Sequence, residues 1–113
     1  MYYMSSKEAA TPDRQSWTFL SNHTHVLICI AQQPDVRLSD VAQKVGVSER
    51  AVHRIVHELI DEGYLSVTKE GRCNVYDIDL EQPLRHPLES HHHIRAVVSP
   101  FLQKSRVPKK GRA

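Results

Sequence analysis

The stretch that decides the fold is LSDVAQKVGVSERAVHRIVHEL, residues 38–59. It predicts two helices that pack at a steep angle through a tight turn. Such a pair needs apolar inward faces, a small residue at the closest approach and a glycine at the reversal. Ala42 and Gly46 fill the last two roles, and Ser39 and Ser48 are the expected N-caps of the two helices. The inward apolar positions are Val41, Val45, Val47, Val52 and Ile55.

The second of these helices has a longer apolar stripe than a tight turn alone requires. The helix is expected to stop at Gly63, a residue suited to closing a helix in the left-handed conformation. The stripe predicts a side buried against a core, because its members follow helical spacing. They are Val52, Ile55, Val56, Leu59 and Ile60.

One helix is expected before this pair, over residues 22–33. Ser21 or Asn22 can cap its beginning, and Pro34 forbids its continuation. Its apolar positions repeat at helical spacing, which predicts that one side faces the same core. These positions are Val26, Leu27, Ile30 and Ala31.

After Gly63 the apolar period changes from helical to alternating, which predicts a β-hairpin. Leu65 and Val67 alternate with polar neighbours, and residues 69–72 (KEGR) form a basic turn. The inward positions of the return strand are Tyr76, Ile78 and Leu80. A helix-turn-helix followed by such a hairpin is the winged-helix arrangement.

A last amphipathic helix is expected over residues 87–103, with Pro100 kinking it or ending it near Ser99. The fold class is therefore α+β and mainly helical: a three-helix core, a β-hairpin wing and an additional C-terminal helix. Residues 1–15 are expected to form a flexible arm, residues 16–103 the domain, and residues 104–113 a disordered basic tail.

On these motifs the sequence resembles the prokaryotic winged helix-turn-helix regulators of the MarR and ArsR type. The phrases LSNHTHVLICIA (residues 20–31) and PLRHPLE (residues 83–89) also resemble small members of that group, so the resemblance covers about residues 17–102. It implies a dimeric transcriptional regulator that binds double-stranded DNA. The third helix would enter the major groove, and the wing would touch the backbone or the minor groove.

The candidate DNA contacts are polar residues on the free side of the third helix and in the wing. Arginine can pair bidentately with guanine, while serine and backbone amides at a helix N-terminus suit phosphate. The helix contributes Ser48, Glu49, Arg50, His53, Arg54 and His57, and the wing contributes Thr68, Lys69, Arg72 and Asn74. The acidic residues Glu58, Asp61 and Glu62 are expected to point away from DNA.

Composition and motifs argue against a membrane protein, an exported protein, a cysteine metal site and an enzyme. The chain has 113 residues and a formal net charge of +2, and it contains no apolar run long enough to span a bilayer and no export signal, so a cytoplasmic protein is expected. Cys29 and Cys73 lack metal-site spacing and are expected to be reduced thiols. No catalytic motif, catalytic residue or cofactor is identified. Whether a small molecule modulates DNA binding stays open.

Two alternative functions stay open, and a homodimer is predicted. His53 and His57, one helical turn apart, could hold a metal in a metal-responsive, ArsR-like repressor, whereas the adjacent histidines at residues 91–93 cannot converge on one ion by themselves. A winged helix used only for protein contacts is the other alternative. A homodimer is predicted, because the apolar stripe from Leu88 to Leu102 is wider than a small domain needs and Trp17, Phe19 or Leu20 could extend it.

Overall fold

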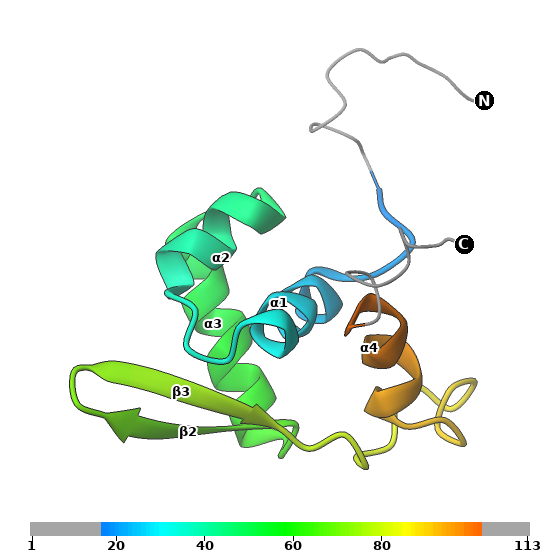
Figure 1. Cartoon of the computed structure of the whole chain (residues 1–113). Coiled ribbons are helices and arrows are strands. Elements are labelled where there is room, and N and C mark those ends of the chain that lie inside the picture. Colours follow the sequence, from blue (N-terminus) through cyan, green and yellow to red (C-terminus); the bar gives the residue numbers. More distant parts are fainter. Residues whose placement is uncertain (1–16, 103–113) are drawn as a thin grey trace, which may run out of the picture.

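The computed structural model describes residues 17–102, which form four helices and one antiparallel hairpin (Figure 1). This confirms the expected mainly helical α+β fold with a winged helix-turn-helix arrangement. The expected arm (residues 1–15) and tail (residues 104–113) lie outside the described residues. In chain order the elements are α1 (Asn22–Gln32), α2 (Leu38–Val45), α3 (Glu49–Asp61), β2 (Leu65–Glu70), β3 (Cys73–Ile78) and α4 (Ile94–Leu102).

Helix α1 begins and ends where its sequence indicates. The Ser21 hydroxyl accepts a hydrogen bond from the Thr24 backbone amide at 3.2 Å, which confirms Ser21 as the N-cap. Val26, Leu27 and Ile30 are buried on the inward side. This places α1 at the centre of the core, in contact with α2, α3, α4 and β3.

Helix α2 begins two residues before the expected start, so the prediction of Ser39 as its N-cap is wrong. Arg37 holds the cap position, and no side chain caps the helix there. The Arg37 carbonyl accepts the amides of Asp40 and Val41 at 3.0 and 3.1 Å, which starts the helix at Leu38. Leu38 is half-buried and packs against the core, so including it in the helix places an apolar side chain inward.

The turn and the third helix confirm the expected chemistry. Gly46 has φ +89°, the left-handed conformation that favours glycine, and its amide donates to the Ala42 carbonyl at 2.8 Å. Ser48 caps α3 by accepting from the Ala51 amide at 3.0 Å. The buried side of α3 consists of Val52, Ile55, Val56 and Leu59.

The wing is attached to the domain only at its base. Leu65 and Tyr76 are buried, and the Tyr76 amide donates to the Pro34 carbonyl at 2.9 Å, which fixes β3 to the link between α1 and α2. Beyond them the hairpin projects away from the helices (Figure 1). Val67, expected to face inward, is 45% exposed, although Tyr76, its partner across the strands, is buried.

The pairing of the strands runs closer to the tip than expected. Lys69 pairs with Asn74 and Glu70 with Cys73, so only Gly71 and Arg72 form the turn. Gly71 has φ +63°, as tight hairpin turns require.

Helix α4 begins at Ile94, seven residues later than expected. Before it, the chain folds back on itself: Pro83 and His93 form an antiparallel bridge, and the Leu84 amide donates to the His92 carbonyl at 3.0 Å. These bonds use backbone groups that an earlier helix would need. Leu88 consequently lies in this loop and is 80% exposed, rather than forming part of the helical stripe.

Pro100 does not end α4 near Ser99, because the helix continues to Leu102. Contacts with α1 support this last turn. Val98 is fully buried, and the Gln32 side-chain amide donates to the Phe101 carbonyl at 3.3 Å. None of the helices between residues 17 and 102 is long and apolar enough to cross a membrane.

Candidate nucleic-acid interface

The free side of α3 is defined by its buried stripe. At about 100° per residue, Arg50, His57 and Asp61 fall within about 40° of one another, directly opposite Ile55 and Leu59. All three are exposed. Arg50 lies in the first turn of α3, whereas Asp61 lies about 16 Å further along the axis. Asp61 was expected to point away from DNA, but it shares the side of Arg50 at the opposite end of the helix.

Two other basic side chains on α3, those of Arg54 and His53, lie beside acids. An Arg54 guanidinium nitrogen lies 3.6 Å from a Glu58 carboxylate oxygen, and His53 lies 3.6 Å from Glu49, each pair one turn apart. Arg50 forms no ion pair with any carboxylate of residues 17–102. The Arg50 guanidinium is therefore the better placed of the two to meet an anionic or hydrogen-bonding partner.

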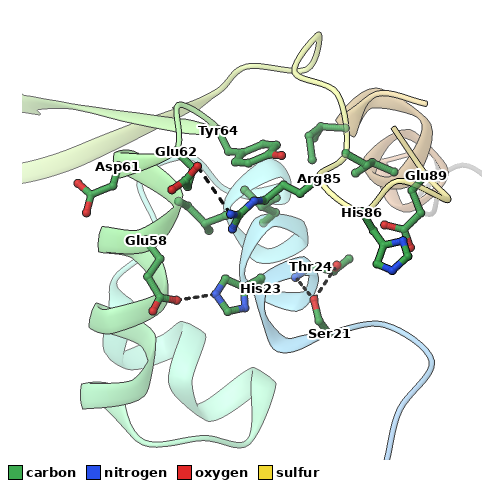
Figure 2. A pocket seen from close by; sticks show the side chains of 14 residues that line it. Ser21, His23, Thr24, Glu58, Asp61, Glu62, Tyr64, Arg85, His86 and Glu89 are labelled. Atoms are coloured by element: carbon green, nitrogen blue, oxygen red, sulfur yellow. Dashed lines mark hydrogen bonds and ion pairs between the residues drawn. The ribbon is translucent and has the colours of Figure 1, made fainter. Parts of the chain in front are cut away.

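A contact that the sequence analysis missed joins α3 to α1. The Glu58 carboxylate lies 2.7 Å from His23 Nε2 (Figure 2), so Glu58 contacts both His23 and Arg54. The hydrogen bond with His23, supported by the Arg54 charge, lowers the pKa of Glu58 below the ordinary value of a glutamate. No sequence signal pairs residues 35 positions apart, because their approach depends on how α1 and α3 cross.

At the beginning of α3, the Ser48 hydroxyl caps the helix and can still donate a hydrogen bond. The Ser48 oxygen accepts the Ala51 amide, but its hydroxyl proton remains able to donate to a phosphate oxygen. Glu49 adds a negative charge to the first turn, where a phosphate would bind. The helix itself carries two arginines and three carboxylates, so its affinity for DNA would depend on Arg50 and Arg54 individually rather than on a net positive charge.

The wing residues are all exposed and divide between its two faces. Lys69 and Asn74 are directly paired across the strands, which places both side chains on one face. Thr68 precedes Lys69 and lies on the other face, and Arg72 occupies the turn. The structure therefore brings Lys69 and Asn74 together, while Thr68 belongs to a separate surface.

The histidines show no metal cluster in the described part of the chain. Residues 17–102 contain no group of three or more His, Cys, Asp or Glu side chains arranged to hold a metal ion. The His91 and His92 rings lie 4.4 Å apart in a tilted arrangement on the loop before α4.

A match to one family model supports the helix-turn-helix prediction. Residues 20–68 match the family model of the IclR helix-turn-helix domain, which is less than half of the chain. No curated protein matches. Two solved structures are distantly similar. One is the PcaV transcriptional regulator of Streptomyces coelicolor in complex with its natural ligand: 17% identity, TM-score 0.46, covering 94% of this chain and 67% of that one.

The second structure is the zinc-dependent MarR family transcriptional regulator AdcR in its Zn(II)-bound state: 22% identity, TM-score 0.42, covering 81% of this chain and 64% of that one. The chain thus spans about two thirds of the length of either regulator. The helix-turn-helix prediction is confirmed by the family match, which names the IclR domain rather than the MarR or ArsR type. The match supports a regulator whose helix-turn-helix binds DNA.

Proposed function

We propose that this chain is a cytoplasmic transcriptional regulator that binds double-stranded DNA sequence-specifically as a homodimer. Helix α3 enters the major groove, and the wing contacts the backbone or the minor groove. The observation that carries the proposal is Arg50: it is exposed opposite the buried stripe of α3 and has no ion-pair partner in residues 17–102.

Arg50 and Arg54 are the proposed base readers. A guanidinium presents its donors in a planar fork that matches the O6 and N7 atoms of guanine. Arg54 would first leave Glu58, but an exposed pair one helical turn apart contributes little to stability. That cost is small beside the roughly 1–3 kcal/mol that a bidentate base contact contributes to discrimination. His53 and His57 flank the two arginines.

The phosphate contacts are proposed at the start of α3 and in the wing. Ser48 and the backbone amides of the first turn of α3 meet one strand of the backbone, and Lys69, Arg72 and Asn74 meet phosphates further along the duplex. Glu49, also a proposed DNA contact, would accept from a cytosine amino group rather than meet a phosphate. Thr68 would contact the backbone only from the other face of the wing. These contacts position the protein without selecting a base sequence.

The proposed homodimer rests on apolar side chains left uncovered within residues 17–102. Trp17 and Phe19 are 66% and 92% exposed, and their rings meet edge to face with centroids 4.9 Å apart. Leu102 at the end of α4 is also exposed, and Leu20 is half-buried. A second copy of the chain would remove these side chains from water.

The test is a selection of duplexes from a random pool by the purified full chain, followed by affinity measurements on an enriched duplex and a shuffled one. Arg50→Ala should weaken the enriched duplex roughly five- to a hundredfold and the shuffled one less. Arg95→Ala, which removes an exposed arginine paired with Glu81 outside α3, is the control and should affect both duplexes similarly.

Two results would reject the proposal. One is a selection that enriches no sequence, and the other is an Arg50→Ala and Arg54→Ala double variant that binds the enriched duplex like the parent. In either case the winged helix would be better explained as a protein-contact module.

A further inference from the structure

A cavity of about 670 Å³ lies beside the C-terminal half of α3, next to the side that carries Arg50 (Figure 2). The N-terminal turn of α1, the C-terminal half of α3 and residues 84–89 of the loop before α4 form its walls. Its volume falls in the range of sites that hold small organic molecules. The proposed DNA contacts do not use this cavity, because none of their side chains lines it.

The floor of the cavity is apolar and well anchored. It consists of side chains from five parts of the chain: Leu27, Leu59, Tyr64, Leu84 and Ile94. Leu27, Leu59 and Ile94 belong to the buried core, so their positions are fixed by packing. The Tyr64 hydroxyl donates to the Pro83 carbonyl at 2.8 Å, which holds the loop against the floor. A ligand with an apolar body could therefore bury it here without first ordering the site.

The rim of the cavity is strongly acidic. Four carboxylates line it, against a single arginine: Glu58, Asp61, Glu62 and Glu89 against Arg85. Glu58 contacts His23 at 2.7 Å and Glu62 lies 3.9 Å from Arg85. Asp61 and Glu89, on opposite sides of the view in Figure 2, form no ion pair within residues 17–102.

From this combination we infer that the cavity binds a small organic cation: an amine whose apolar body rests on the floor and whose ammonium group lies among the rim carboxylates. With histidines neutral, the lining carries four negative charges and one positive charge. A cavity of about 670 Å³ has a linear dimension of about 9 Å, close to the Debye length of about 8 Å at physiological salt, so salt screens these charges only in part. An anion of the same shape would be repelled.

The test compares three probes that share one apolar body: 4-phenylbutylamine, 4-phenylbutanol and 4-phenylbutyrate. Titration calorimetry on the full chain without DNA should give the tightest binding for the amine, roughly fivefold tighter than for the alcohol, and the weakest for the carboxylate. Because no DNA is present, this result is independent of the proposed function.

Variants locate the binding. The Asp61→Asn and Glu89→Gln double variant should lose most of the preference for the amine over the alcohol, since both carboxylates are exposed and their replacement leaves the core intact. Asp35→Asn, an exposed carboxylate outside the cavity, is the matched control and should keep the preference. Leu84→Trp, which fills the floor, should weaken the amine and the alcohol alike.

Three results would overturn the inference. They are no measurable binding of the amine at about 1 mM, equal or tighter binding of the carboxylate, and a charge preference that survives in the double variant. In the last case the amine binds to acidic surface elsewhere on the chain.

Discussion

Replacing Ile55 by alanine tests the assignment of the two sides of α3. Ile55 is 2% exposed, and the change removes three carbon atoms from the core. At about 0.8 kcal/mol per carbon, the lost burial amounts to about 2.4 kcal/mol. An incompletely collapsed cavity adds about 1 kcal/mol or more, so the free energy of unfolding should fall by about 3–4 kcal/mol.

Ile60→Ala is the matched control, because it removes the same atoms from the same helix at a half-buried position. Its cost should be about half as large, in proportion to the smaller area that it withdraws from water. Urea unfolding, followed by circular dichroism, should show a lower midpoint with an unchanged slope for both variants. Below its melting temperature, Ile55→Ala should bind DNA like the parent, since the side chain faces away from the proposed groove.

Equal losses of stability in the two isoleucine variants would refute this reasoning, as would a loss below about 1 kcal/mol for Ile55→Ala. Either result would mean that Ile55 does not face the packed interior. The exposed side of α3, and with it the choice of Arg50 as a reader, would then be wrong.

Four further outcomes are expected. Gly46→Ala should cost about 1 kcal/mol of folding stability in urea unfolding, because φ is +89° and only backbone strain opposes the new methyl group, which meets no atom within 4 Å. Tyr64→Phe should cost about 1 kcal/mol in the same assay, since it leaves the Pro83 carbonyl without its donor. Glu58 has a pKa below its ordinary value in the folded chain, so its ionised form stabilises the fold at neutral pH and this stabilisation disappears as the pH falls through that lowered pKa. Glu58→Gln should therefore be less stable than the parent near neutral pH and equal to it in acid, and an equal difference at both would contradict the His23 contact. Light scattering over a dilution series should show a dimer, and a monomer at tens of micromolar, on the order of 10 to 50 µM, would exclude the proposed assembly.

The parts of the fold that sequence predicted well depend on local chemistry. Ser21 and Ser48 are short polar residues directly before apolar periodic stretches, and a helix can use such a cap whatever surrounds it. Gly46 is similar, because a left-handed turn needs glycine before any tertiary contact forms. The exposed position of Arg50 followed from helical periodicity alone.

The parts that were missed depend on contacts between distant segments. The start of α4 at Ile94 is set by the bridge between Pro83 and His93, which no periodicity reveals. Tyr64 directly precedes Leu65, so strict alternation places it on the polar side, but it is buried and its hydroxyl donates to the Pro83 carbonyl. The contact between His23 and Glu58 likewise exists only because α1 crosses α3 at that point.

The attachment of the wing at its base has a consequence for how this chain can vary. Since Leu65 and Tyr76 hold the hairpin and residues nearer the tip bury almost nothing, adding or deleting two residues on each strand would leave the core unchanged. Such a change would preserve which side chains face each way, because the strand period is two. The length of the hairpin, and with it the length of duplex that it can reach, could therefore change during evolution at little cost to folding stability.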